Sequence, residues 1–248
     1  MSLTRKDIKY GFWNIKNRKP EYLNFDSDRI HKVKYLGIGF KNEENKSKEL
    51  KIWNSTLEQL DNVEYIWTYH KLNQTSFESI CRMKNLKGIS IKWSSIKDLE
   101  CLKAQSDLKH LNIGLSTSIE RIQPITCLKS LLTFDSENLK NVVDWDIISS
   151  LTHLEGLGVN GAMNERLKIK SLDIFEDLKN LSYLFLTSTK VLDNSLEPIK
   201  ELKNLQNLRL TNEWSQEQLS ELKKSLPNLK FGNVSNDAQT QMFKKIFG

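Results

Sequence analysis

Four histidines, three cysteines and scattered carboxylates are the residues of this 248-residue chain that could carry catalysis or bind a metal. We expect His70 and His110 on one surface but two strands apart, at about 5 Å per strand, which is too far for shared ligation. Asp144 and Asp146 flank Trp145 in a segment that reads as a solvated loop. Motifs of phosphate-binding loops, zinc proteases and serine hydrolases do not occur. We therefore expect no enzyme activity, no catalytic residue, no metal and no cofactor.

The cysteines Cys81, Cys101 and Cys127 are odd in number and show no Cys-x-x-Cys spacing. Each precedes a repeat start, on the side where residues should face the core. We expect three buried, reduced thiols, which suits a reducing compartment.

The composition is that of a soluble folded chain, with 38% apolar and 27% charged residues and a net charge of +6. This mild basic excess permits nucleic-acid binding without indicating it. No run of about 18 apolar residues predicts a membrane span. The first twenty residues lack the apolar run of a secretory signal, so we expect a cytoplasmic protein.

The elements that position these side chains follow from a nine-fold pattern, Leu-x-x-Leu-x-Leu, in which any apolar residue can replace a leucine. The clearest copies are Leu86-Ile89-Ile91, Leu108-Leu111-Ile113, Leu154-Leu157-Val159, Leu181-Leu184-Leu186 and Leu205-Leu208-Leu210. The weaker copies are Val33-Leu36-Ile38, Val63-Ile66-Thr68, Leu128-Leu131-Thr133 and Leu229-Gly232-Val234. A period of roughly 20 to 30 residues predicts a stacked array that presents a long surface.

Each copy predicts a strand followed by a helical segment. The final Leu-x-Leu has the period of two of a half-buried strand, and the residues that follow step by three or four, as on one side of a short helix. Because one unit cannot bury its own apolar face, neighbouring units should stack and form a parallel sheet.

This pattern resembles the leucine-rich repeat family, in its short bacterial, internalin-like class, over residues 32–234. The returns that carry the resemblance are Leu178-Lys179-Asn180-Leu181 and Leu202-Lys203-Asn204-Leu205, with Met83-Lys84-Asn85-Leu86 and Leu226-Pro227-Asn228-Leu229 as variants. The resemblance implies an α/β solenoid: a curved array of about nine repeats with a parallel β-sheet on the concave face and short helices or turns on the convex face.

The chain departs from the family where an asparagine usually follows the strand by three residues. Hydroxyl residues that can bond the turn backbone stand at several of these positions: Ser94, Ser116, Ser136 and Thr189. Other repeats carry Lys41, Lys71, Ala162 and Glu213 there. We expect an irregular solenoid with inserts at 39–62, 135–153 and 160–180. The domain prediction is an N-terminal cap at 1–30, the repeats at 31–235 and a C-terminal cap or tail at 236–248.

Alternation along each strand assigns side chains to the concave face, at the second, fourth, sixth and seventh positions after the first leucine. From these we predict a protein-binding site made of Tyr35, Phe40, Tyr65, Trp67, Tyr69, His70, Trp93, His110, Phe134, Tyr183, Phe185 and Arg209. Dense exposed aromatic residues are typical anchors of protein interfaces. The middle repeats place Gly88, Gly114, Gly156 and Gly158 on this face, which would leave room for a partner. The alternative is that the aromatic rings only pack on one another or are covered by the chain itself.

The function predicted is a non-catalytic module that binds a protein or peptide on its concave face. A scaffold, an adaptor and an immunity-type inhibitor all fit, and we expect a monomeric, cytoplasmic, bacterial protein. The alternative is a nucleic-acid-binding repeat protein that uses basic loops and stacking aromatics. Lys92 and Arg209 are the only basic side chains on the predicted face, which disfavours nucleic acid.

Overall fold

The structure, a computed structural model, divides the chain into two compact units, each described here by itself. Unit 1 takes in residues 2–11, 132–140, 145–162, 164–211 and 213–234, and unit 2 takes in residues 19–131 and 141–144. These are the residues that the structure describes.

Parallel strands run through both units, one before the first repeat and one for each of the first eight repeats. In unit 2 they are β1 (Glu21–Leu23), β2 (Tyr35–Ile38), β3 (Tyr65–Thr68), β4 (Gly88–Lys92) and β5 (His110–Gly114), side by side in chain order. In unit 1 they are β6 (Thr133–Glu137), β7 (Gly156–Asn160), β9 (Tyr183–Leu186) and β11 (Asn207–Leu210). A separate parallel pair in unit 1 joins β8 (Leu167–Ile169) to β10 (Thr189–Val191).

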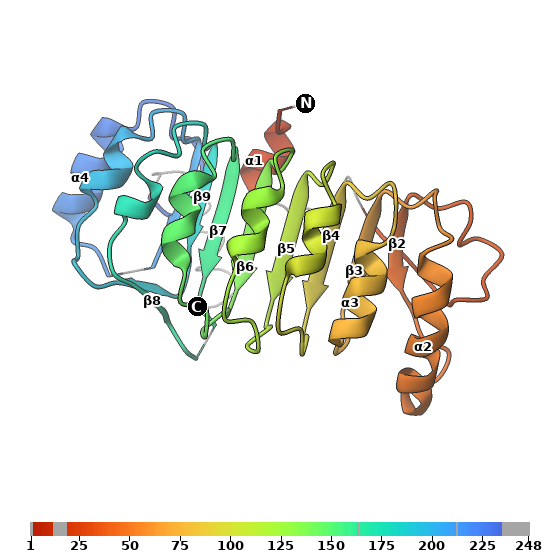
Figure 1. The fold of residues 1–248 in the computed structure, drawn as a ribbon. Helices are drawn as coiled ribbons and strands as arrows, with labels where there is room; N and C mark the ends of the chain where they lie inside the picture. The colour runs from red at the N-terminus through yellow and green to blue at the C-terminus, as the bar shows by residue number, and fades with distance from the viewer. Residues whose placement is uncertain (1, 12–18, 163, 212, 235–248) are drawn as a thin grey trace, which may run out of the picture. The chain divides into compact units, whose positions relative to one another are not determined.

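Short helices return the chain from one strand to the next. The α-helices are α1 (Arg5–Tyr10), α2 (Lys46–Leu57), α3 (Gln74–Cys81) and α4 (Gln216–Ser225). The 3-10 helices are η1 (Glu43–Asn45), η2 (Glu100–Ala104), η3 (Gln123–Cys127), η4 (Trp145–Ser150), η5 (Asp173–Phe175) and η6 (Glu197–Glu201). In unit 2, α2 and α3 cover one face of the strands (Figure 1). We call the opposite face of the strands, in each unit, the front face.

The pattern leucines form the core as aligned ladders. Leu36 pairs with Ile66, Ile66 with Ile89 and Ile89 with Leu111, and all four side chains are buried. Because the side chains of a strand alternate between its two faces, this register sends the intervening residues to the front face. The parallel strands and the short helices confirm the predicted α/β solenoid.

The hydroxyl residues that replace the family's asparagine do bond the backbone. The hydroxyl of Thr189 donates to the carbonyl of Val159 at 2.7 Å, and that of Ser116 donates to the carbonyl of Gly114 at 3.0 Å. Ser94 donates to the Ser116 hydroxyl at 2.7 Å, so the hydroxyls also connect neighbouring repeats. The turn prediction is confirmed at these positions.

The residue seven positions after the first leucine adopts a left-handed backbone in several repeats. Its φ is 63° at Trp93, 50° at Leu115, 54° at Asn138 and 54° at Ser188. This conformation turns the chain away from the sheet at the end of the strand, and Asn or Gly adopts it at the lowest cost.

The predicted phase of one repeat was wrong. Phe134 pairs with the core residue Leu157, is 0% exposed and faces the core, so it cannot belong to the predicted binding surface. The repeat begins at Leu131, not Leu128, and this start lies midway in the sequence between Leu108 and Leu154. Leu128 follows the 3-10 helix η3 and matches the pattern only by its spacing.

The cysteine prediction was also wrong. Cys81 at the end of α3 and Cys101 in η2 form a disulfide, with Cα atoms 5.7 Å apart, and Cys127 is exposed. The inference of a reducing compartment from buried thiols therefore loses its basis, since disulfides persist mainly in oxidising compartments.

The N-terminal residues contribute to both units. β1 pairs in parallel with β2 and so covers the edge of the first repeat in unit 2, whereas α1 belongs to unit 1. Residues 236–248 lie outside the described residues, and the predicted domain boundaries stay a prediction. The longest helix of the described residues, α2, has 12 residues, against about 20 needed to cross a bilayer.

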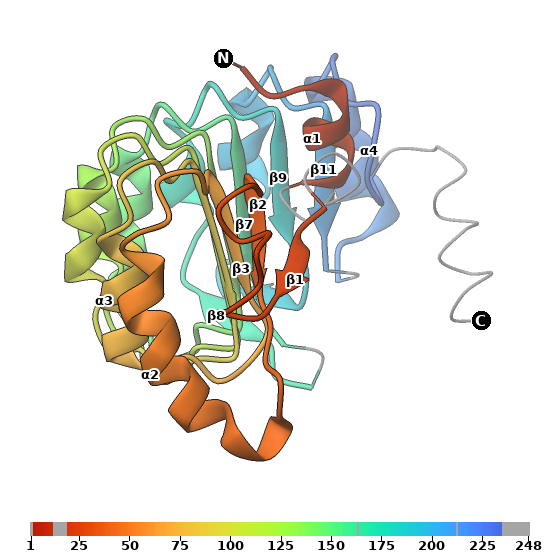
Figure 2. The same cartoon turned by 90° about the vertical axis from the view of Figure 1, so that its right-hand side faces the viewer.

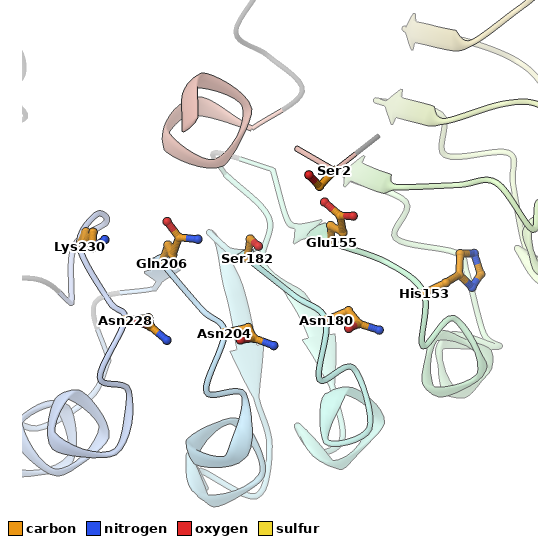
Figure 3. A pocket seen from close by; sticks show the side chains of 9 residues that line it. All are labelled: Ser2, His153, Glu155, Asn180, Ser182, Asn204, Gln206, Asn228 and Lys230. Atoms are coloured by element: carbon orange, nitrogen blue, oxygen red, sulfur yellow. The ribbon is translucent and has the colours of Figure 1, made fainter. Parts of the chain in front are cut away.

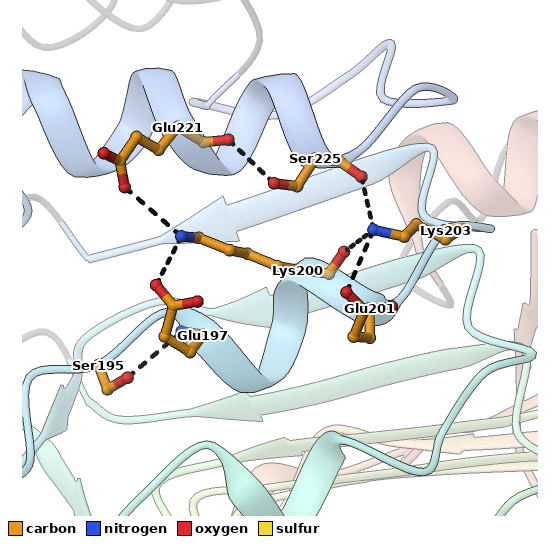
Figure 4. Close-up of polar contacts among 7 residues, drawn as sticks. All are labelled: Ser195, Glu197, Lys200, Glu201, Lys203, Glu221 and Ser225. Atoms are coloured by element: carbon orange, nitrogen blue, oxygen red, sulfur yellow. Dashed lines mark hydrogen bonds and ion pairs between the residues drawn. The ribbon is translucent and has the colours of Figure 1, made fainter.

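Ion pairs join the last two helical segments of unit 1, on the side away from the front face. Lys200 of η6 lies 2.5 Å from Glu197 and 3.4 Å from Glu221 of α4 (Figure 4). Lys203 donates to the carbonyl of Ser225 at 3.2 Å. Such exposed pairs contribute little to stability, so we assign them to fixing α4 against η6.

Replacing Phe134 by alanine tests the corrected phase. Because the ring is fully buried, we expect Phe134→Ala to lower the free energy of unfolding by about 3–5 kcal/mol in a denaturant titration. Leu132→Ala, at the half-buried neighbouring position, is the control and should cost clearly less. Equal losses would support the original phase.

The cysteine pairing predicts thiol reactivity. In the native, unreduced protein only Cys127 should react with a thiol reagent, and after reduction and unfolding three thiols should react. Three thiols counted by mass in unfolded but unreduced protein would contradict the disulfide.

Candidate functional site

The front face of unit 2 carries a continuous group of aromatic rings. Tyr65 lies 5.3 Å from Tyr35, 6.0 Å from Trp67 and 6.0 Å from His110, measured between ring centroids. These rings come from β2, β3 and β5, so the strand register brings together side chains that are far apart in the sequence. The register thus brings these four predicted side chains together on one face of the strands.

Tyr65 reaches His110 by lying across Gly88 on the intervening strand. A side chain added at Gly88 would collide with the Tyr65 ring. Unit 1 repeats the arrangement, because Tyr183 lies across Gly156 and its hydroxyl donates to Asp135 on β6 at 2.8 Å. These two glycines make room for the chain's own tyrosines, which is the local-packing alternative, and not for a partner.

Exposure separates the predicted site residues into three groups. Tyr69 and Trp93 are exposed, at 37% and 47%. The half-buried residues are Tyr35, Phe40, His70 and Arg209. The buried residues are Tyr65, Trp67, His110, Phe134, Tyr183 and Phe185. A partner could therefore touch only the first two groups. The buried rings of Tyr65 and Trp67 pack against the half-buried Tyr35.

The accessible rings of unit 2 gather toward the carboxyl ends of the strands. Tyr22, which is 49% exposed, lies 6.0 Å from Tyr69, and Phe40 lies 4.4 Å from His70, again between ring centroids. Just beyond β3, the N–H of Leu72 donates to the carbonyl of Trp93 at 3.1 Å, which brings Trp93 to the same end of these strands. We call Tyr22, Phe40, Tyr69, His70 and Trp93 the aromatic rim.

Tyr22 was missed as a site residue because it lies in the predicted cap. The sequence signal is that Tyr22 lies in the middle of the short alternating segment Glu21–Leu23. This segment forms an additional strand, which pairs with β2. That pairing carries Tyr22 to the front face, next to the rings of the first repeats.

The aromatic rim has a cationic border. The ammonium of Lys46 lies 5.7 Å from the centroid of the Phe40 ring, and that of Lys92 lies 5.5 Å from the Trp93 ring. Burial raises the pKa of Tyr69, and burial together with the nearby Tyr69 raises the pKa of Tyr22. The two hydroxyls also hydrogen-bond to each other, so the pair is held together as two neutral phenols.

The front face of unit 1 is covered instead of open. The Tyr183 and Phe185 rings stack with centroids 4.8 Å apart, and both are buried. The guanidinium carbon of Arg209 lies 4.5 Å from the centroid of Phe185. Helix α1 lies along this face beside β11 (Figure 2), where the side-chain amide of Asn207 donates to carbonyls of the helix.

A shallow polar pocket of about 600 Å³ opens along unit 1 before the strands begin (Figure 3). Its lining residues are Ser2, His153, Glu155, Asn180, Ser182, Asn204, Gln206, Asn228 and Lys230. Asn180, Asn204 and Asn228 each donate to a carbonyl of the preceding repeat, at 2.8, 2.8 and 2.9 Å. These asparagines form a structural ladder, so the row of polar groups follows from repeat stacking.

The chemistry of the described side chains favours binding. Nowhere in the described residues do three or more His, Cys, Asp or Glu side chains converge as a metal site. His70 is a neighbour of Phe40 and His110 of Tyr65, in different repeats, so the two imidazoles serve separate aromatic contacts. What the site offers a partner is aromatic surface, phenol hydroxyls and a few ammonium groups.

Adding a methyl group at Gly88 tests the crossing of Tyr65 over that strand. We expect Gly88→Ala to lower the free energy of unfolding by about 1–3 kcal/mol, because the added carbon displaces a buried ring. In a Tyr65→Ala background the same change should cost much less, and chemical denaturation of all four proteins measures this coupling. Additive costs would contradict the packing.

Comparisons with known proteins extend to structure alone. No family model and no curated protein matches the sequence. An internalin, InlF, from Listeria monocytogenes is similar in structure, with a TM-score of 0.50 and 18% identity over 74% of this chain and 57% of the internalin chain. The mouse RP105/MD-1 complex contains a chain with a TM-score of 0.52 and 19% identity, over 75% of this chain and 32% of that one.

The chain thus spans only part of the length of these solved structures, and at such identities their likeness bears on the fold and not on the partner. This likeness agrees with the parallel strands and short helices described above. The chain therefore has the fold of leucine-rich repeat proteins.

Proposed function

We propose that this chain is a non-catalytic protein-binding module and that the aromatic rim of unit 2 is its binding surface. The observation that carries the proposal is the exposure of Tyr22, Tyr69 and Trp93, at 49%, 37% and 47%, within one part of the front face. Tyrosine and tryptophan are the residues that most often dominate the affinity of protein interfaces.

Trp93 adds a second argument, because stability alone gives little reason for tryptophan there. The residue holds a left-handed backbone with φ of 63°, which costs a residue other than glycine roughly 1–2 kcal/mol. Asn138 occupies the equivalent position of another repeat, where its side chain suits that backbone. A tryptophan that remains half exposed at such a position is explained by contact with a partner.

The chemistry of the rim also indicates what the partner presents. The exposed rings favour an apolar or aromatic contact, and Lys46 and Lys92 beside Phe40 and Trp93 favour carboxylates around it. We infer an apolar segment bordered by acidic residues. A scaffold, an adaptor and an inhibitor of the immunity type remain the roles we predict for such a module, in a monomeric, bacterial protein.

Nucleic acid is the second candidate, and the same two lysines are the observation that favours it. Their ammonium groups, 5.7 and 5.5 Å from the centroids of rim rings, could bind phosphates while the rings stack on bases. The proposal of a protein partner ranks first because only a few cations border the rim, whereas nucleic-acid sites need a continuous basic groove.

The double variant Tyr69→Ser/Trp93→Asn tests the proposal. Affinity capture from the native cell with quantitative mass spectrometry should show at least a tenfold loss of the partner, since an anchoring aromatic typically contributes about 2 kcal/mol. Asparagine at position 93 keeps the left-handed turn, so the variant should fold as the wild type does.

The matched control is Ile52→Ser/Val143→Ser, which removes two exposed apolar side chains elsewhere in unit 2. It should retain the partner. Equal recovery of every captured protein by all three baits would refute the rim as the binding surface. Salt-sensitive binding of a fluorescent oligothymidylate that Tyr69→Ser/Trp93→Asn abolishes would favour the nucleic-acid candidate instead.

A further inference from the structure

Residues 2–11, which we call the N-terminal arm, occupy the front face of unit 1 through the end of helix α1 (Figure 2). The side-chain amide of Asn207 donates to the carbonyls of Ile8 and Lys9, at 2.9 Å each. The guanidinium of Arg209 donates to the Lys9 carbonyl at 3.4 Å. The repeats therefore bind the last carbonyls of a helix, which carry its partial negative charge.

A glycine completes the end of the arm. Gly11 caps α1 with φ of 71° and donates its N–H to the carbonyl of Asp7 at 2.7 Å. A side-chain carbon at Gly11 would lie 2.8 Å from the ring of Phe185. The fit of this helix end against the Phe185 ring thus requires a residue without a side chain.

Most of these contacts are made to backbone atoms of the arm, so they do not depend on which side chains the arm carries. Asn207 and Arg209 bond carbonyl groups that every helix end presents, and Phe185 requires only glycine. Asn207 is fully buried and Arg209 half-buried, so both would leave polar groups without these acceptors if the arm departed. The surface therefore suits a helix end that presents free carbonyl groups and a glycine.

Helix α1 depends on this surface for its structure. Helix α1 has six residues, which is too few for a stable isolated helix. Its stability depends on a capping box between Thr4 and Asp7 and on its contacts with the strands of unit 1. Ile8 is its one buried apolar side chain, and the N–H of Leu3 donates to the Glu155 carboxylate at 2.7 Å. A segment that offers the same helix end and glycine would satisfy the same groups of unit 1.

We propose that the front face of unit 1 is a second binding site, which takes the C-terminal turn of a short helix ending in glycine, presented by another protein. In the isolated chain the N-terminal arm fills this site. The site is separate from the aromatic rim, since it lies on β9 and β11 of unit 1 and recognises backbone carbonyls instead of apolar side chains.

The full-length variant Gly11→Val empties the site while leaving its residues intact. The probe is a synthetic peptide of residues 2–11, titrated into ¹⁵N-labelled protein. The readout is the side-chain amide signal of Asn207, identified by its absence from Asn207→Ala. In Gly11→Val the chemical shift of this amide should differ from that of the wild type. As peptide is added, the shift should move to the wild-type value and then stay constant once the site is saturated.

Three controls accompany this titration: two should bind weakly or not at all, and the third should bind as the original does. In the wild type the intramolecular arm, at an effective concentration of the order of millimolar, should weaken binding of the peptide at least tenfold. A peptide carrying Gly11→Val should not bind the emptied site. A peptide with alanine in place of Arg5 and Tyr10 should bind as the original does, because it keeps the capping box and the glycine.

The proposal is overturned if the Asn207 signal of Gly11→Val coincides with that of the wild type before peptide is added. It is equally overturned if millimolar peptide fails to move that signal, or if the alanine-substituted peptide does not bind. If the fraction of dimer of Gly11→Val or of the wild type increases with protein concentration, two copies exchange their arms. That result would overturn a site for another protein.

Discussion

Every feature of this protein depends on the alignment of one parallel strand with the next. A repeat of this length buries its leucines only against its neighbours, so the ladder from Leu36 through Ile66 and Ile89 to Leu111 both forms the core and fixes the register. The register then decides, at every second residue, which side chains reach the front face. Turn hydroxyls such as Thr189 and the asparagine ladder before the strands hold the same alignment at either end.

The same constraint gives the two units different front faces. In unit 2 the aligned strands gather rings into a packed layer whose outer members stay accessible, Tyr69 and Trp93 among them. In unit 1 the equivalent positions hold Asn207 and Arg209, whose donors meet the carbonyls of α1. One architecture thus provides an aromatic surface in one unit and a surface of hydrogen-bond donors in the other.

The sequence predicted the array, the parallel strands and the turn hydroxyls, because these depend on local periodicity. It failed at Phe134 since Leu128 and Leu131 both fit the pattern, and only pairing with Leu157 distinguishes them. It could not foresee the burial of Trp67 or the disulfide of Cys81 with Cys101, because both depend on distances between repeats. Nor does any local signal relate Gly11 to Phe185, which belong to distant parts of the sequence.

The tyrosines that cross a glycine have a consequence for how the chain unfolds. In an ideal solenoid each repeat interacts only with its immediate neighbours, so the ends can open one repeat at a time. Tyr65 bypasses its neighbour to meet His110, and Tyr183 does the same to meet Asp135. Each ring therefore makes three successive repeats interdependent, and within each unit these repeats should unfold as one cooperative block.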